Sequence, residues 1–221
     1  MEKTIKVTGK GNISVKPDMI RLLITLEGMK ESYEETLVLH TEQIEGLAEC
    51  FAKLGFARAE LKTLSFHVDT EYENYNDGNN VWKKRFKGYK FVHGMKLEFE
   101  ADNKRLGRVL YALANSQIKP EFRICYTVKD TEAVKNALLG RAVEDSKIKA
   151  EVLAKAAGVK LGDILTIDYS WGEVEFISSP MSRMALACAP AEVNQVDSYA
   201  MDIEPDDIDV SDTVTVIWSI A

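Results

Sequence analysis

The sequence predicts an α+β fold in one domain spanning residues 1–221, with antiparallel strands in hairpins and three helices packed on the sheet. Long stretches of alternating apolar residues occur in adjacent pairs, and short turns can join such pairs only in antiparallel fashion. The chain of 221 residues contains 46% hydrophobic and 29% charged residues, which are the proportions of an ordinary globular protein. The predicted element order is ββαββαβαββ.

The first two strands are predicted over residues 4–15 and 19–29, with a short turn between them. Gly9 and Gly11 in the first strand raise the question of phosphate binding. A dinucleotide fingerprint needs a third glycine where Ser14 stands, and it must open a helix, whereas here a strand follows. We therefore interpret the two glycines as the site of a bulge or a close backbone crossing inside a long strand.

Three capping signals mark the predicted helices. Ser32, Asp102 and Asp130 each precede a stretch with helical periodicity, so their side chains are expected to cap the helix N-termini. The apolar face of the first helix is predicted to contain Tyr33, Leu37, Ile44, Leu47, Phe51 and Leu54. The inward stripe of the third helix is predicted to contain Leu139, Val143, Ser146, Ala150, Leu153 and Ala157.

The remaining strands are predicted over residues 61–75, 81–101, 122–128, 164–171 and 208–220. An Asp-Gly turn within residues 76–80 is expected to join the first two of them as a hairpin. Residues 175–206 contain three prolines and no clear periodicity, so they are predicted to form an extended loop.

The three histidines do not indicate a metal site. His40 lies in the middle of a helix among polar neighbours, and none of the three occurs in an HxH, HxxxH or HExxH arrangement. His67 and His93 fall on the two strands of the predicted hairpin, about three residues out of register and on opposite faces. The three cysteines are widely spaced and indicate neither a zinc cluster nor a disulfide framework. We predict no cofactor, no metal and no catalytic residue, and expect that the protein is not an enzyme.

The stretch WKKRFKGYKF, residues 82–91, alternates basic and aromatic side chains. Such a mixture is typical of proteins that bind single-stranded nucleic acid, because cations follow the phosphates while aromatic rings stack on bases. The net charge of −7 opposes this function, and an exposed strand alternates polar and apolar residues in any case. Nucleic-acid binding is therefore the alternative hypothesis.

The C-terminal part of the chain is strongly acidic. No Lys or Arg follows Arg183, and the acidic residues beyond it give a charge of −8, which leaves +1 for the first 183 residues. We predict that the acidic part contacts the basic hairpin of another subunit, so that the protein is a homo-oligomer. The predicted interface comprises Trp82, Lys83, Lys84, Arg85, Phe86, Lys87, Asp206, Asp207, Asp209 and Asp212.

Three blocks of the sequence resemble the SIMPL-domain family, many of whose bacterial members are periplasmic immunogenic or oxidative-stress-defence proteins. They are VTGKGNISVKPDMIRLLITLEG at 7–28, RAVEDSKIKAEVLAKAAGVKLGDILTIDYS at 141–170 and IEPDDIDVSDTVTVIWSI at 203–220. Asp206 departs from the family, which usually has glycine after the proline. The resemblance implies an α+β fold, large homo-oligomers in some members and a loose association with stress tolerance, and it implies no catalytic residues.

Location is predicted from the absence of apolar segments. The N-terminus MEKTIKVTGKGN lacks the apolar run of a signal peptide, although many members of the family carry an export signal. No stretch reaches the roughly 18 apolar residues of a membrane span. We therefore expect a cytoplasmic protein without a membrane span and identify no small-molecule substrate.

Overall fold

The computed structural model describes residues 3–76, 82–169, 175–178, 199 and 202–221. The chain forms two compact units. The first consists of residues 1–18, 126–178 and 205–221, and the second of residues 19–125 and 179–204. The predicted α+β class, antiparallel pairing and element order are confirmed, although the strands form two sheets rather than one. The single-domain assignment stays a prediction.

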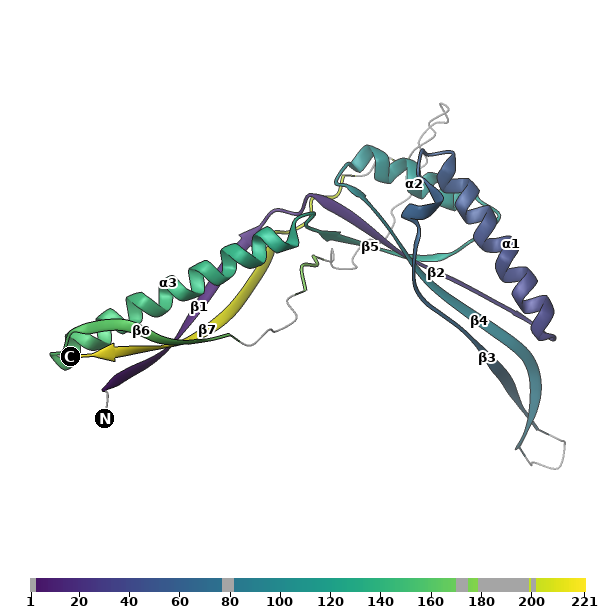
Figure 1. Cartoon of the computed structure of the whole chain (residues 1–221). Helices are drawn as coiled ribbons and strands as arrows, with labels where there is room; N and C mark the ends of the chain where they lie inside the picture. The colour runs from purple at the N-terminus through teal and green to yellow at the C-terminus, as the bar shows by residue number, and fades with distance from the viewer. Residues whose placement is uncertain (1–2, 77–81, 170–174, 179–198, 200–201) are drawn as a thin grey trace. The chain divides into compact units, whose positions relative to one another are not determined.

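The first unit contains a three-stranded antiparallel sheet in the order β1-β7-β6. β1 pairs with β7 along its whole length without a register shift. Helix α3 packs along β1 and β7 (Figure 1). The elements are β1 (Thr4–Val15), α3 (Thr131–Ala157), β6 (Leu161–Asp168) and β7 (Ile208–Ile220).

The two glycines of β1 allow α3 to lie against the strand. A Cβ atom at Gly9 would lie 2.0 Å from the carbonyl oxygen of Ala142, and one at Gly11 would lie 2.2 Å from that of Leu138. Any side chain at either position would therefore push the helix away. The close backbone crossing expected of these glycines is confirmed, and there is no bulge beside them.

The buried stripe of α3 follows four-residue steps: Leu138, Ala142, Ser146, Ala150 and Ala154. The prediction of Ser146 and Ala150 on this stripe is confirmed, whereas Leu153 is 49% exposed and Ala157 is exposed too, so the inward assignment of these two is wrong. Small side chains form most of the stripe because only these fit where helix and strand backbones touch.

The second unit contains a four-stranded sheet in the order β3-β4-β2-β5, with α1 packed on β2 and β4 and also in contact with α2. Large apolar side chains form its core: alternate residues of β2 and β4 are buried, together with residues of both helices. The elements are β2 (Met19–Lys30), α1 (Tyr33–Ala52), a 3₁₀ turn (Arg58–Glu60), β3 (Lys62–Asn76), β4 (Trp82–Glu100), α2 (Asn103–Asn115) and β5 (Glu121–Thr127).

The local signals read from the sequence mostly hold. The side chains of Ser32, Asp102 and Asp130 each accept a hydrogen bond from a backbone N–H in the first turn of the helix that follows, which confirms the three N-caps. The β3–β4 hairpin is also confirmed. β6 begins at Leu161, three residues earlier than predicted, because Leu161 already pairs with the end of β7.

The predicted hairpin between the first two strands is wrong. β1 pairs with β7, and β2 pairs with β4. The backbone N–H of Asp18 donates to the carbonyl oxygen of Thr127 at 3.2 Å. The Asp18 carboxylate accepts from the backbone N–H of Lys129 at 2.8 Å. These bonds hold the connection against the segment that precedes α3, so the chain does not fold straight back on itself.

The extended loop predicted for residues 175–206 lies largely outside the described residues. Its described beginning is packed rather than loose. Phe176 is buried with Ile208, and Ser178 pairs with Tyr126 through two backbone hydrogen bonds of 2.8 and 2.9 Å. The loop assignment is therefore wrong for this part of the segment.

Candidate functional site

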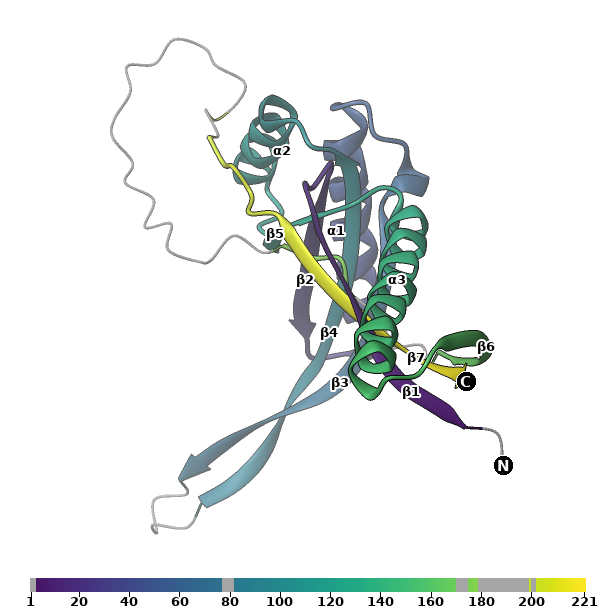
Figure 2. The same ribbon diagram turned by 90° about the vertical axis from the view of Figure 1, so that its left-hand side faces the viewer.

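β3 and β4 continue beyond the sheet as a two-stranded ribbon, defined here as residues 71–76 and 82–88. β2 pairs with β4 only from Tyr89 to Glu100, so among the described strands no third strand joins the ribbon. Figure 2 shows the ribbon projecting past the end of β2. Gly88, with φ 153°, marks the point where β4 leaves the sheet, and a Cβ there would lie 2.2 Å from the Lys30 carbonyl oxygen. A two-stranded ribbon is only marginally stable without further packing.

One face of the ribbon is aromatic. Phe86 lies directly opposite Tyr72, with ring centres 5.8 Å apart. Trp82 and Lys84 share this face, because alternate residues of a strand point the same way. Trp82 is 71% exposed and Phe86 44%, so this face offers large apolar surface to a partner.

The opposite face carries Lys83 and Arg85, and a carboxylate of the same ribbon neutralises part of its positive charge. The Nε of Arg85 donates to the Glu73 carboxylate at 2.8 Å, and the guanidinium lies 5.6 Å from the centre of the Tyr75 ring. Lys87 stands at the register shift in β4. The six predicted interface residues of the hairpin thus divide between two faces, and Arg85 already has a carboxylate partner in its own chain.

The predicted acidic residues lie at and before the start of β7. Asp206, Asp207 and Asp209 are exposed. Asp212 instead accepts a hydrogen bond of 3.1 Å from the Tyr169 hydroxyl. Burial, together with this bond to a carboxylate, raises the pKa of Tyr169. Three of the four aspartates are therefore well placed to meet a cationic partner.

The edge of β7 beside these aspartates is open in the described part of the chain. β6 pairs only with residues 215–220 of β7. Within the described strands, residues 208–214 therefore have a neighbour, β1, on one side only. The ribbon belongs to the second unit, whereas the acidic residues and this edge belong to the first. Unpaired edges of this kind bind further strands readily.

The structure also forms a site that the sequence prediction missed. The Nε2 atom of His40 on α1 lies 2.9 Å from the Nδ1 atom of His93 on β4, and the Nε2 atom of His93 lies 2.9 Å from the Thr63 hydroxyl on β3. Phe66 and Phe91 pack against the His40 ring. Burial lowers the pKa of both histidines, and the charge of His40 lowers that of His93 further.

Two sequence patterns could have located this pair. His40 fills the gap between Leu37 and Ile44 in the stripe of α1, where a helix repeats every three or four residues. His93 alternates with Phe91 on the buried face of β4. Neither position was recognised as inward-facing, because histidine is a polar residue.

The register prediction for His67 and His93 is partly confirmed. His67 pairs with Val92, one residue from His93, rather than lying three residues out of register. A β-bulge after Glu71 supplies part of this shift. The two histidines do lie on opposite faces, and His67 is instead 3.7 Å from the Asp69 carboxylate. Among the described residues, no group of three or more His, Cys, Asp or Glu side chains is placed to hold a metal ion.

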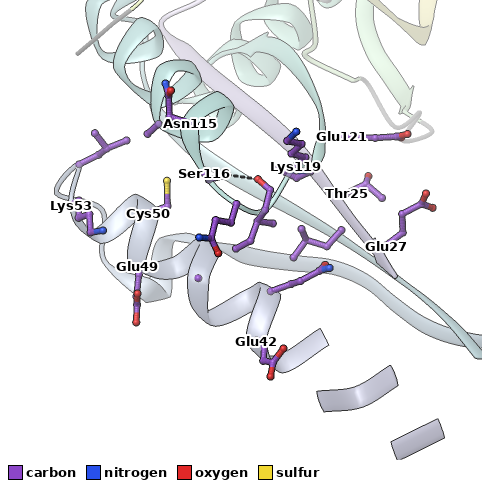
Figure 3. A pocket seen from close by; sticks show the side chains of 18 residues that line it. Thr25, Glu27, Glu42, Glu49, Cys50, Lys53, Asn115, Ser116, Lys119 and Glu121 are labelled. Atoms are coloured by element: carbon purple, nitrogen blue, oxygen red, sulfur yellow. Dashed lines mark hydrogen bonds between the residues drawn. The ribbon is translucent and has the colours of Figure 1, made fainter. Parts of the chain in front are cut away.

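A groove of about 920 Å³ lies between α1 and the segment 115–121, beside β2. Figure 3 shows Cys50 of α1 and Lys53, the residue after this helix, at the groove, with Lys119 and Glu121 on the other segment. Burial raises the pKa of the Cys50 thiol, and nearby Lys53 offsets this only in part. No histidine stands among the described residues that line the groove, so the thiol has no imidazole beside it there to act as a base.

Known proteins resemble this chain over most of its length. The 26 kDa periplasmic immunogenic protein of Brucella melitensis is 24% identical over 183 residues, which cover 83% of this chain and 70% of that protein. The protein of the same name from Brucella abortus matches equally. An uncharacterized protein YggE of Edwardsiella ictaluri is 24% identical over 220 residues, covering 98% of this chain and 87% of that protein.

The names of the two Brucella relatives contradict the cytoplasmic location expected from the sequence, because both are periplasmic proteins. The N-terminal sequence alone therefore does not determine the compartment. Among the described residues, no helix combines the length and the apolar character that a membrane crossing requires.

A family model also matches nearly the whole chain. The SIMPL model, described as a protein of unknown function (DUF541), matches residues 5–218. This span includes every element between β1 and β7, together with most of these two strands. The three blocks that resemble this family all lie almost wholly inside the span. The chain therefore belongs to the SIMPL family.

Proposed function

We propose that the protein is a non-enzymatic, self-assembling protein whose ribbon binds a second copy of the chain. The observation that carries this proposal is the exposed aromatic face of the ribbon. Trp82, Phe86 and Tyr72 present apolar surface on a pair of strands that no described third strand supports. Exposed aromatic surface of this kind is typical of protein–protein interfaces.

The proposed acceptor is the first unit of a neighbouring subunit. Among the described strands its residues 208–214 pair with β1 alone, and Asp206, Asp207 and Asp209 lie at the start of this stretch. Lys84 and Lys87 of the ribbon are exposed, and their positive charge is opposite to that of these aspartates. Such a contact joins two different surfaces and is therefore heterologous, so it closes into a ring when the rotation between subunits permits.

Charge alone cannot supply the affinity. An exposed ion pair contributes up to about 1 kcal/mol and is screened by salt. Burial of Trp82 and Phe86 contributes on the order of 2–3 kcal/mol for each ring, before the entropy cost of association is subtracted. The aromatic face should therefore determine affinity, while the charges determine which surfaces meet and how fast.

Charge reversal tests this interface. The Lys84→Glu, Lys87→Glu variant should shift the native mass toward the monomer, and adding Asp206→Lys, Asp207→Lys and Asp209→Lys to that chain should partly restore the assembly. Arg85 is left unchanged, because its loss would leave Glu73 without its partner. The matched control reverses Lys6 and Lys16, which are exposed on the first unit. An oligomer indifferent to the ribbon and aspartate changes would discard this interface.

Binding of single-stranded nucleic acid is the second candidate, favoured by the presence of Lys84 between Trp82 and Phe86 on one exposed face. A labelled oligonucleotide should then bind at low salt, with an affinity that falls steeply as salt is added. Loss of binding in Trp82→Ser would locate the contact on the ribbon. A wild-type protein that binds no oligonucleotide at low salt removes this candidate.

We extend the proposal to location and physiology. The names of the Brucella relatives support a place in the periplasm, and the family resemblance supports a role in stress tolerance. Fractionation of cells that express the chain from its native gene tests the first point. Survival of cells lacking the gene under peroxide tests the second, with restoration by the wild-type chain as the control.

A further inference from the structure

The His40–His93 contact joins three elements of the second unit. His40 belongs to α1, His93 to β4, and Thr63 to β3, the edge strand of the sheet. The chain of contacts runs from His40 Nε2 to His93 Nδ1, and from His93 Nε2 to the Thr63 hydroxyl, with both distances 2.9 Å. His93 is only 6% exposed, so these bonds replace water around it.

The bond between the two rings exists only when one facing nitrogen lacks a hydrogen. A neutral imidazole donates through one nitrogen and accepts through the other. One added proton can be placed on the outer nitrogen of His40, which leaves the bond intact. A second proton puts a hydrogen on both facing nitrogens and brings two positive charges together, so the bond is lost and the rings repel.

The surroundings contain no described charge to offset this repulsion. Along α1, the residues one turn either side of His40 are Thr36 and Ile44, and the β2 residue paired with His93 is Leu26. β3 contributes Thr63 and Phe66, and β4 contributes Phe91. Among the described residues in contact with the two rings, the ionisable group that each ring meets is the other ring. His67, also on β3, faces the opposite side of the sheet.

We propose that the His40–His93 pair is an acid-sensitive latch that holds α1 and β3 to β4 at neutral pH and releases them when both rings are protonated. The release is local, because the pair lies within the second unit and contacts only elements of that unit. The latch operates in the single chain and does not depend on self-assembly.

Burial of the two histidines sets the pH range in which the latch opens. The pKa of each histidine is lowered from its ordinary value of 6.5, so the closed form stays neutral while the opened form takes up protons. Acid therefore favours opening from pH 6.5 downward until the rings of the closed form also protonate. Each histidine increases the opening equilibrium by up to about tenfold per pH unit in this range.

Hydrogen exchange of the full chain tests the latch, with rates corrected for the intrinsic effect of pH. Between pH 6.5 and pH 5.5, amides of α1 and of β3 near Thr63 should open roughly five- to thirtyfold more often. Amides of α3 and β1 in the first unit should not change. Equal changes in both units, or no change in either, would overturn the proposal.

The His40→Gln, His93→Gln variant keeps hydrogen-bonding groups at both positions but removes their titration, so its exchange should be independent of pH in this range. His67→Gln, exposed on the opposite face, is the matched control and should behave as wild type. A double variant that retains the wild-type pH dependence contradicts the latch.

Where the double variant fails to fold, ¹⁵N imidazole spectra of the wild type decide the question. The two rings should titrate as a coupled pair below pH 6.5 and lose their mutual hydrogen bond at the second step. Independent titration of His40 and His93 at the ordinary value would refute the proposal.

Discussion

The two units pack helix on antiparallel sheet in opposite ways. In the first unit, α3 touches β1 through Gly9, Gly11 and a stripe of mostly small residues. In the second, α1 packs on the sheet and α2 contacts α1, and both helices bury large side chains such as Phe51 and Leu106. The first contact has no room for an added atom, whereas the second depends on volume that a mutation can remove. The first unit should therefore be destabilised most by substitutions that add volume, and the second by substitutions that remove it.

The largest effect is expected from removing volume in the second unit. Leu97 on β4 is fully buried, so Leu97→Ala loses transfer free energy and leaves a cavity. We expect the free energy of unfolding to fall by about 3 kcal/mol, measured by denaturant unfolding. Leu64→Ala, on a residue 55% exposed in β3, is the control and should cost much less. Similar losses for both would show that the core of this unit is not packed as described.

A somewhat smaller effect is expected from adding volume in the first unit. Gly9→Ala places a Cβ 2.0 Å from a backbone oxygen, so α3 must move away from β1. The expected loss of unfolding free energy is about 2 kcal/mol. Gly140→Ala, on α3 with nothing within 4 Å of its Cβ, should instead stabilise by about 0.5–1 kcal/mol. Two changes of the same sign would contradict the close approach.

The smallest effect concerns Glu98 on β4. Burial opposes its ionisation, but hydrogen bonds from Lys96 at 2.9 Å and Arg21 at 2.6 Å outweigh this and hold its pKa below the ordinary 4.5. Glu98→Gln should therefore cost up to about 1 kcal/mol at pH 7, since the group is partly exposed. The lowered pKa means that this stability is present above pH 4.5 and disappears as pH falls through the folded value.

Unfolding curves at several pH values test this. The difference between wild type and Glu98→Gln should shrink toward zero in acid, whereas Glu45→Gln, exposed on α1, should match the wild type throughout. A difference that stays constant with pH would assign the loss to packing rather than to charge.

The sequence was informative where one local signal determines one element. The caps at Ser32, Asp102 and Asp130 and the glycines of β1 were predicted correctly because capping and backbone contact impose narrow residue preferences. Strand pairing was not determined in this way. β1 and β7 are joined by long-range pairing, and nothing in residues 4–15 specifies a partner about 200 residues later in the chain.

The candidate sites, too, were visible in the sequence where they depend on local composition and were missed where they depend on long-range pairing. The basic and aromatic composition of the ribbon was visible in the sequence, but its two faces depend on the register that pairs Phe86 with Tyr72. The ion pair of Arg85 with Glu73 also follows from that register. The patterns around His40 and His93 place each histidine on an inward face, but their contact also depends on the packing of α1 on β4, which the sequence does not specify.

The native mass of the wild-type chain in solution tests the central claim most directly. Light scattering over a range of concentrations should give a multiple of 24.8 kDa, and the Trp82→Ser, Phe86→Ser variant should lie closer to 24.8 kDa at the same concentration, because the aromatic face supplies most of the affinity. A wild-type chain that remains at 24.8 kDa at high concentration would contradict self-assembly.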